Sequence, residues 1–279
     1  MFLKDMENKT LNKNWIEWFV GFCDADANFQ VFPKQRSYLK KDGTLSKYIN
    51  IGYGFHISLS QRETELLKDF QIKFNHIGHI YTYPEKEECR WAVTKKSELI
   101  YLIETAFSLD NVILITKHQR ERLARLKYVL INNIKRFETS EEFENFLEKS
   151  YVQPEINDEY LSQVYLKQDT AFKNWIIGFI NGEGYFYVNP RGYLIFSIEH
   201  TDRKALELIK QYLDLGPNIL DRGNRGDTRQ NSYSLSIQSK KDILTIKNLC
   251  ENPLLNRLEG FKLKQYNNWA HPAKVVDET

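Results

Sequence analysis

Two strings of the chain share one pattern, and each string ends in an acidic residue. They read WFVGFCDAD, from Trp18 to Asp26, and WIIGFINGE, from Trp175 to Glu183, so the second copy lies 157 positions after the first. Two carboxylates that are brought together must share a proton, stay apart or bind a cation. Oxygen ligands with open positions suit Mg²⁺, and divalent ions shared with a phosphate support phosphodiester hydrolysis. Asp26 and Glu183 are therefore the first candidates for a metal-dependent site.

Two helices must position these acids. Apolar residues at helical spacing predict a helix over the first string that ends at Ala27, and a second helix from Trp175 to Gly182. Because Gly21 and Gly178 have no Cβ, we expect the two helices to pack closely through them. The two acids would then lie side by side at the helix C-termini, where the helix dipole already places partial negative charge.

The second string can also be interpreted as a helix cap without a chemical role. An isolated Asn-Gly-Glu-Gly sequence after an apolar helix is usually a helix cap. A cap accounts for Gly182 and Gly184, but it does not account for an acid at the same register of the first copy, where Ala27 replaces the glycine. The repetition therefore favours a functional role.

The segments after each string change from helical to alternating periodicity. The best example is the segment 49–60, in which apolar residues alternate with polar or small ones, and Lys41–Gly43 provides a turn before it. A helix at 62–74, a hairpin turning at 84–88, a strand through Trp91 and helices over 97–137 follow. The second half repeats this order, with strands at 185–189 and 193–199, a helix at 202–213, a hairpin turning at 221–231, a strand at 233–237 and then helices.

The predicted fold class is α+β, with two pseudo-symmetric αββαββα units that each contain a four-stranded antiparallel sheet. We predict an N-terminal unit at 1–137, an acidic connector at 138–170 that is partly helical and solvated, and a C-terminal unit at 171–279. The net charge is only +2, but residues 138–169 contain nine acids and two bases, so the rest of the chain carries +9. Such a surface is compatible with binding to a phosphate backbone, although ordinary solvated lysines would give the same count.

Both strings resemble the LAGLIDADG motif of the homing endonucleases, in the single-chain form with two motifs. The first string departs from that motif at the final glycine, where Ala27 stands, and the second uses Glu183 as its last acid. The resemblance implies a saddle-shaped, site-specific endonuclease that binds a long duplex. It also implies that the motif helices lie at the central interface, that the sheets lie in the major groove, and that both strands are cut to leave short 3′ overhangs.

The resemblance also implies site residues. The metal-binding acids fall on Asp26 and Glu183, and the preceding carbonyls of Ala25 and Gly182 are further candidate ligands. A polar residue near the end of the second strand of each unit corresponds to Gln61 and His200. A basic residue early in a later helix of each unit corresponds to Lys117 and Arg257. Asp24 and Asn181, at a less strict motif position, receive no catalytic role.

The polar faces of the predicted strands are the expected DNA-reading surface, because Arg, Asn and Gln suit base contacts while Lys and Ser more often contact phosphates. In the first half, the candidates are Asn28, Gln30, Lys34, Arg36, Asn50, His56 and Ser58. In the second half, they are Tyr185, Tyr187, Asn189, Arg191, Ser197, Glu199, Arg222, Asn224, Arg225, Arg229, Ser234, Ser236 and Gln238.

The expected cofactor is Mg²⁺, with Mn²⁺ as a substitute and Ca²⁺ supporting binding without cleavage. The expected partner is double-stranded DNA bound by a monomer. A different class remains open on the same scaffold, namely a splicing maturase that binds its own intron RNA or a regulator that binds DNA without cutting it. His76 and His79 are spaced like a ligand pair, but no further His or Cys lies at metal-site spacing, so we interpret them as loop or core residues.

The cysteines, the apolar runs and the composition give expectations about the compartment and about membrane association. Three cysteines without a Cys-x-x-Cys pair favour a reducing compartment and core packing of Cys23 and Cys250. No apolar run reaches the ~20 residues of a membrane span, and no signal sequence is visible. The Lys-, Asn-, Ile- and Tyr-rich composition together with the family resemblance suggests a protein encoded in a mitochondrion or plastid, while a bacterial or archaeal source stays open.

Overall fold

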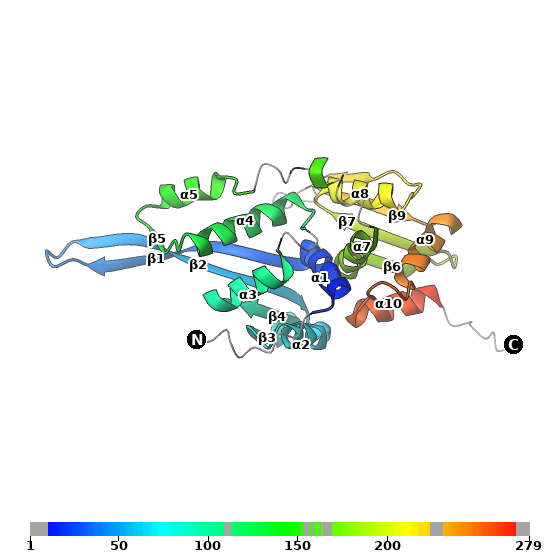
Figure 1. Ribbon diagram of the computed structural model, residues 1–279, viewed down its shortest axis with the longest axis horizontal. Helices are drawn as coiled ribbons and strands as arrows, with labels where there is room; N and C mark the ends of the chain where they lie inside the picture. The colour runs from blue at the N-terminus through cyan, green and yellow to red at the C-terminus, as the bar shows by residue number, and fades with distance from the viewer. Residues whose placement is uncertain are drawn as a thin grey trace.

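The chain forms two similar units that lie side by side (Figure 1). The structure is a computed structural model that describes residues 11–108, 113–152, 157, 159–161, 163, 169–223 and 231–271. The strand order is β1-β2-β4-β3 in the first sheet and β6-β7-β9-β8 in the second, and neighbouring strands are antiparallel in both. The predicted fold class of two pseudo-symmetric α+β units is therefore confirmed.

The first unit begins with the motif helix and a long hairpin. Its helices and strands are α1 (Lys13–Asp26), β1 (Ala27–Leu39), β2 (Leu45–Ser60), α2 (Thr64–Lys73), β3 (His79–Tyr83), β4 (Glu88–Val93), α3 (Lys96–Ala106), α4 (Lys117–Ile131) and β5 (Arg136–Phe137), with short 3₁₀ turns at η1 (Gln61–Glu63) and η2 (Pro84–Lys86). The Asn12 side chain begins α1 by accepting hydrogen bonds from the backbone N–H groups of Asn14 and Trp15.

The second unit follows α5 (Ser140–Glu148) and repeats the same order with shorter strands. Its elements are α7 (Asp169–Glu183), β6 (Gly184–Val188), β7 (Leu194–His200), α8 (Arg203–Tyr212), β8 (Leu220–Gly223), β9 (Ser232–Ile237), α9 (Lys240–Cys250) and α10 (Gly260–Ala270). Each motif helix leads directly into a strand, because Ala27 and Gly184 are already the first residues of β1 and β6.

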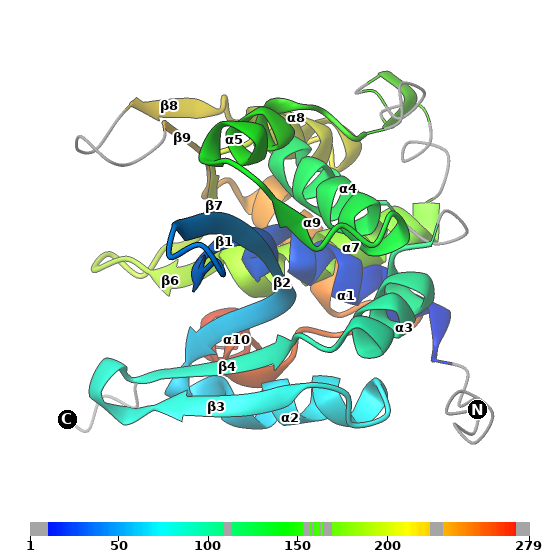
Figure 2. The same cartoon turned by 90° about the vertical axis from the view of Figure 1, so that its left-hand side faces the viewer.

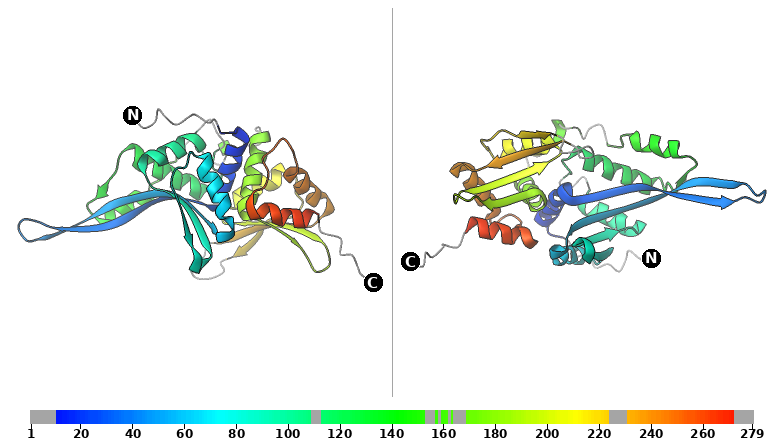
Figure 3. Two further views of the ribbon diagram at one scale, coloured as in Figure 1. Left: turned by 90° about the horizontal axis from the view of Figure 1, so that it is seen from below. Right: turned by 180° about the vertical axis from the view of Figure 1, so that it is seen from behind.

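The helices cover one face of the two sheets and leave the opposite face uncovered. Figure 2 shows α4 and α5 on one side of β1 and β2, and the left panel of Figure 3 shows both sheets along the underside of an arch with the helices above them. In that panel, α1 and α7 stand at the centre with their C-terminal ends toward the underside. The motif acids thus lie where the two uncovered sheet faces meet.

Close backbone contact joins the two motif helices. A Cβ atom added to Gly21 would lie 2.0 Å from the carbonyl oxygen of Trp175, and one added to Gly178 would lie 1.8 Å from that of Trp18. Side chains add a buried hydrogen bond across the same interface, from Asn174 Nδ2 to Glu17 Oε2 at 2.8 Å. The predicted packing through the paired glycines is confirmed, and it fixes the two helix C-termini relative to each other.

One hydrophobic core runs through both units. Trp18, Phe19 and Phe22 of α1 are fully buried, as are Trp175 and Phe179 of α7. All of them belong to a single cluster that reaches the inner faces of both sheets, so the helix pair is the centre of the core as well as the junction. Cys23, Cys89 and Cys250 are buried free thiols, in agreement with the prediction of core packing for the first and last of them.

The first sheet is larger than the four-stranded sheet predicted from the sequence. The short strand β5 pairs with Ile49 and Asn50 of β2 and makes five strands. Helix α5 then buries Phe143 and Phe146 in a small cluster with Ile49, although the sequence suggested a solvated connector. Together β5 and α5 support the base of the β1–β2 hairpin, which projects far beyond the rest of the sheet (Figure 1).

Candidate active site

Asp26 and Glu183 are the last residues of α1 and α7, and the geometry brings the two helix ends into contact. A Cβ atom added to Gly182 would lie 2.4 Å from the Cβ of Ala25 and 2.7 Å from Asp26 Oδ2. The carboxylate of Asp26 therefore lies directly against the residue that precedes Glu183. Glycine is required at position 182, because any side chain there would displace the carboxylate.

Both carboxyl groups are difficult to ionise. Burial raises the pKa of Asp26 to about 6. Burial, together with the neighbouring negative charge of Asp26, raises the pKa of Glu183 to about 8. Repulsion between two partly desolvated carboxylates has this effect wherever they share a site. A bound cation would remove it, so the pair has the electrostatic character of an oxygen-ligand metal site.

Lys262 is the basic residue of the site, and the sequence analysis did not identify it. Its ammonium group donates a hydrogen bond to the carbonyl oxygen of Gly184, the residue after Glu183. Burial lowers the pKa of Lys262, while the charges of Asp26 and Glu183 act in the opposite direction. Lys262 thus balances part of the negative charge of the acid pair from the N-terminal turn of α10.

The donor set around the pair contains oxygen atoms rather than nitrogen or sulfur. Within the described residues, no three His, Cys, Asp or Glu side chains converge as a ready metal cage. A negative charge on Glu63 adds to the raised pKa of Asp26, and Glu199 acts on Glu183 in the same way. Two carboxylates with nearby carbonyls suit Mg²⁺, which keeps several waters and takes phosphate oxygens to complete its shell.

Asp24 and Asn181 hold the starts of two later helices through hydrogen bonds. Asp24 accepts hydrogen bonds from the backbone N–H groups of Ile115 and Thr116 and from the indole of Trp175. Asn181 Oδ1 accepts the backbone N–H of Glu259 at 2.7 Å. The inner polar position of each motif therefore holds the N-terminus of α4 or α10.

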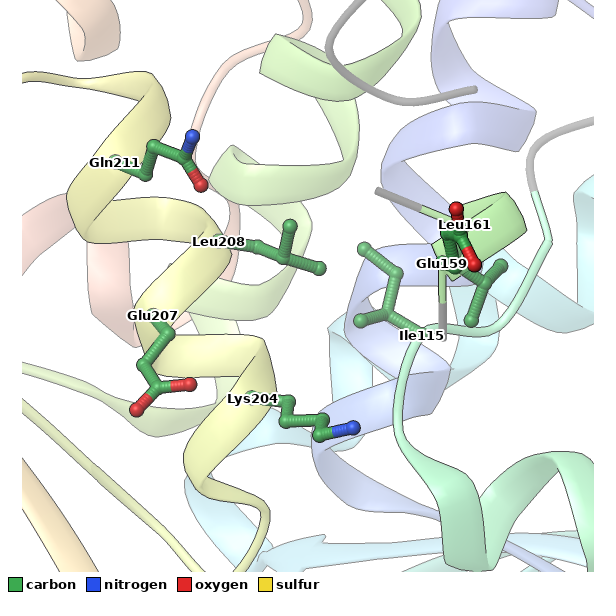
Figure 4. Close-up of a pocket in the computed structure, with 7 residues that line it drawn as sticks. All are labelled: Ile115, Glu159, Leu161, Lys204, Glu207, Leu208 and Gln211. Carbon is green, nitrogen blue, oxygen red and sulfur yellow. The ribbon is translucent and has the colours of Figure 1, made fainter. Parts of the chain in front are cut away.

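The described surface carries several hollows. Four hollows of about 290, 670, 470 and 610 Å³ indent the described surface, and none of these four is lined by Asp26 or Glu183. Figure 4 shows the first, where Ile115, Leu161 and Leu208 point toward one another across the boundary between the units.

The raised pKa values predict how the stability of the metal-free protein depends on pH. A carboxyl group with a raised pKa in the folded state stabilises the fold while it is protonated, and this contribution is lost as pH rises through that pKa. We expect the melting temperature in EDTA to fall as the pH rises from about 4, where Asp and Glu ionise in the unfolded chain, to about 8, the pKa of Glu183 in the folded protein. Thermal denaturation across this range would measure it, and the double variant D26N/E183Q should show a flatter profile. Some slope should remain, because burial also raises the pKa of Asp24 to about 7. A parent profile as flat as that of the variant would contradict the expectation.

The family and three known proteins that this chain resembles are all named as endonucleases. The family described as LAGLIDADG endonuclease matches residues 19–121. The chain is 25% identical over 269 residues to the probable intron-encoded endonuclease Cox1-I1b of Schizosaccharomyces pombe, covering 92% of this chain and 63% of that protein. It is 27% identical over 262 residues to the probable intron-encoded endonuclease aI3 of Dictyostelium citrinum, covering 90% and 92%. A shorter match, 28% identical over 111 residues, covers 38% of this chain and only 19% of the probable intron-encoded endonuclease 4 of Neurospora crassa.

Solved structures share the whole fold. The LAGLIDADG meganuclease I-CpaMI bound to uncleaved DNA matches with a TM-score of 0.61 and 19% identity, over 91% of this chain and 89% of that one. The I-SmaMI LAGLIDADG homing endonuclease bound to cleaved DNA matches with a TM-score of 0.63 and 21% identity, over 93% and 88%. The first unit is similar to the LAGLIDADG endonucleases over residues 19–121, and the chain shares the fold of the LAGLIDADG meganucleases.

The polar and basic residues predicted for the site lie in four different segments of the chain. Arg257 is exposed and lines the hollow beside α2, so the basic residue at the acids is Lys262 instead. Lys117 is the first residue of α4, and its backbone N–H donates to Asp202 Oδ2 at 2.8 Å. His200 is buried and stacks on His118, with its Nδ1 accepting the backbone N–H of Asp202. Gln61 is exposed at η1, at the end of β2 as predicted.

The strand register brings the first group of reading candidates onto one face of the first sheet. Asn28 pairs with His56 and Lys34 pairs with Asn50, so alternate residues of the two strands stand side by side. Ser58 continues this row beside Arg90 of β4. Lys34 and Arg36 are exposed, and the remaining candidates, Asn28, Gln30, Asn50, His56 and Ser58, are partly exposed.

The second sheet carries most of its candidates in the same way, with one correction. Tyr185, Ser197 and Ser236 form a row across β6, β7 and β9, and the other accessible candidates are Tyr187, Asn189, Arg191, Glu199, Arg222 and Gln238. Ser234 was wrongly assigned to the accessible surface, because it is only 2% exposed and its hydroxyl accepts a hydrogen bond from Arg222. Asn224, Arg225 and Arg229 lie outside the described residues.

Arg90 is a sheet-face residue that the sequence analysis missed. Its guanidinium donates to Ser58 Oγ at 2.7 Å and to Glu88 Oε1 at 2.9 Å. The alternation of Arg90 with the buried Cys89 and Trp91 in the sequence could have placed it on the polar face. It extends the polar row of β1 and β2 onto β4.

Proposed function

We propose that the protein is a site-specific double-strand DNA endonuclease that hydrolyses one phosphodiester bond in each strand and leaves short 3′ overhangs. The observation that carries the proposal is the contact of Asp26 with the Gly182–Glu183 peptide segment at the centre of two uncovered sheets. Relatives named as intron-encoded endonucleases and similar structures bound to DNA support it. The acids would act on the backbone, and the sheet faces would read the bases.

The residues at the centre fit a divalent metal. Asp26 and Glu183 would hold it, with the carbonyls of Ala25 and Gly182 as further oxygen ligands. When bound, Mg²⁺ would provide an activated hydroxide and stabilise the leaving oxygen. Lys262 would offset the negative charge that accumulates as the phosphodiester is attacked. Mn²⁺ should replace Mg²⁺, and Ca²⁺, which is larger and less strict in its geometry, should permit binding without cutting.

The decisive experiment incubates the protein with a randomised duplex library and Mg²⁺ and sequences the cut ends. The proposal expects one preferred site with staggered ends that carry 3′ overhangs. If no duplex is cut but a folded intron RNA binds tightly, the protein is a maturase. If a duplex binds without being cut, it is a DNA-binding regulator on the same scaffold.

The unequal hairpins predict an asymmetric footprint on the DNA. Strand β1 has 13 residues and its counterpart β6 has 5. At roughly 3.3 Å per residue and 3.4 Å per base pair, the difference corresponds to roughly eight base pairs. Hydroxyl-radical footprinting in Ca²⁺ should therefore show longer protection on the side of the N-terminal unit.

A shortened hairpin provides the control for this footprint. Replacing residues 37–47 with Asn-Gly keeps the Arg36–Tyr48 pair as the last one before a two-residue turn. The additional protection should disappear in this variant while the central footprint stays. A symmetric footprint for the parent protein would show that the projecting hairpin does not contact DNA.

We further propose that the protein acts as a monomer, since one chain contains both motif helices, and that it originates from an intron of a mitochondrion or plastid. Relatives from fungi and from Dictyostelium are named as intron-encoded. No described helix combines the length and the apolar character that crossing a lipid bilayer requires.

A further inference from the structure

The two halves of the candidate active site can be matched residue by residue. Asp24 and Asn181 occupy the same motif position, and each accepts a backbone N–H from the residue that begins a later helix. Asp24 holds Thr116, the N-cap of α4, and Asn181 holds Glu259, the N-cap of α10. Thr116 and Glu259 are therefore equivalent, and so are the residues three positions further on.

Those equivalent residues are Gln119 and Lys262. In its own unit, each side chain contacts the residue that follows the motif acid. Gln119 Nε2 donates to the carbonyl oxygen of Ala27 at 2.5 Å, and Lys262 Nζ donates to that of Gly184. Ala27 and Gly184 are again 157 positions apart, each directly after its motif acid. The same hydrogen bond is thus made by a neutral amide in one half and by an ammonium group in the other.

The surrounding charges do not restore the symmetry. Lys262 faces Asp26, Glu183 and Glu63, with Arg62 close enough to affect its charge. On the other side, the guanidinium of Arg120, next to Gln119, donates to the carbonyl oxygen of Ile115. His118, at the start of the same helix, stacks on His200, and burial lowers its pKa to about 4, so it is neutral near pH 7.

We propose that this inequality makes the protein cut the two DNA strands in a fixed order, with the strand whose scissile phosphate lies beside Lys262 cut first. The inference rests on the proposed endonuclease function. In each strand, a water oxygen bonds to phosphorus, the bond from phosphorus to the 3′ oxygen breaks, and that oxygen leaves as a hydroxyl after taking a proton. Negative charge develops on the phosphoryl and leaving oxygens, and an ammonium group stabilises it more strongly than an amide does.

The expected difference between the two cutting rates follows from how strongly an ammonium group and an amide stabilise the developing charge. Removing one donor that stabilises developing charge typically slows a reaction by about 10²–10³-fold, and an amide retains part of the effect of an ammonium group. We therefore expect the first strand to be cut about tenfold faster than the second or more. A nicked duplex should accumulate before the double-strand break.

The experiment uses the duplex recovered from the randomised library, labelled differently on each strand, with Mg²⁺ and excess enzyme. The parent protein should nick one strand first. The variant K262Q should slow that strand selectively and bring the two rates together, and the exchange variant Q119K/K262Q should reverse the order. Equal rates in the parent, or an unchanged order in an exchange variant that still cuts, would overturn the proposal.

Gln119 is buried, so its replacement could change folding or DNA binding as well as strand order. Both must therefore be measured separately. Affinity for the same duplex in Ca²⁺ and the melting temperature should be close to those of the parent protein in each variant that is interpreted. If Q119K/K262Q does not fold, duplexes already nicked at one scissile position provide the same comparison with the parent protein. The duplex nicked at the second position should then lose its remaining strand about tenfold faster than the duplex nicked at the first, and equal rates overturn the proposal. Absence of any cutting by the parent would instead overturn the proposed function itself.

Discussion

Replacing Glu183 by Gln is expected to lower double-strand cutting by more than about 10³-fold while target binding stays nearly unchanged. The amide keeps the shape of the side chain but removes the negative charge that would hold a divalent ion, and the hydroxide that the ion provides is lost with it. The variant Asp26→Asn should behave in the same way, because its carboxylate lies against Gly182 in the same site. Single-turnover cutting with Mg²⁺ and anisotropy binding with Ca²⁺ would measure the two effects separately.

A matched control is available on the helix side of the molecule. Glu65 is an exposed acid of α2 that forms an ion pair with Lys68, so Glu65→Gln removes one charge that does not belong to the acid pair. Cutting by this variant should equal that of the parent protein. Full cutting by either Asp26→Asn or Glu183→Gln would reject the assignment of the metal-binding acids, whatever the control shows.

The central features were predictable because they depend on a pattern that occurs twice. Two strings at one spacing, each with a glycine in mid-helix and an acid at the end, allow few arrangements other than a close helix pair. Strand alternation likewise predicted β2, and the register of Asn28 with His56 agrees with the predicted polar face. These signals are local, or they are repeated, so one sequence is enough to detect them.

The secondary site residues were harder because they depend on long-range contacts between segments of unequal length. Lys262 was missed since hairpins of different length remove any fixed spacing between it and the motif. The feature that aligns the two units is a backbone N–H at the start of the later helix that donates to Asp24 or Asn181. This hydrogen bond becomes visible only in three dimensions. Once that hydrogen bond is known, Gln119 and Lys262 align directly.

The fifth strand of the first sheet could also not be predicted from a single sequence. Strand β5 has only two residues, and its pairing with Ile49 and Asn50 is specified by the β2 edge that it meets rather than by its own composition. Helix α5 is rich in acids, which suggested a solvated connector, yet its Phe143 and Phe146 are 4% and 6% exposed. Amphipathic packing of two aromatic residues outweighed the charge run.

Replacing Gly178 by Ala is expected to destabilise the protein by about 3 kcal/mol, at the upper end of the range for overpacking. The added Cβ would lie 1.8 Å from the carbonyl oxygen of Trp18, which is helix backbone and cannot rotate away. The helices must separate, which moves Glu183 away from Asp26 and should reduce cutting even at temperatures where the variant is folded. Gly216→Ala is the control, because its Cβ would meet only Asp242 Oδ2 at 3.5 Å. Urea denaturation of both variants would measure the difference, and a Gly178→Ala protein as stable as the control would mean that the helices do not approach closely enough to bring the acids together.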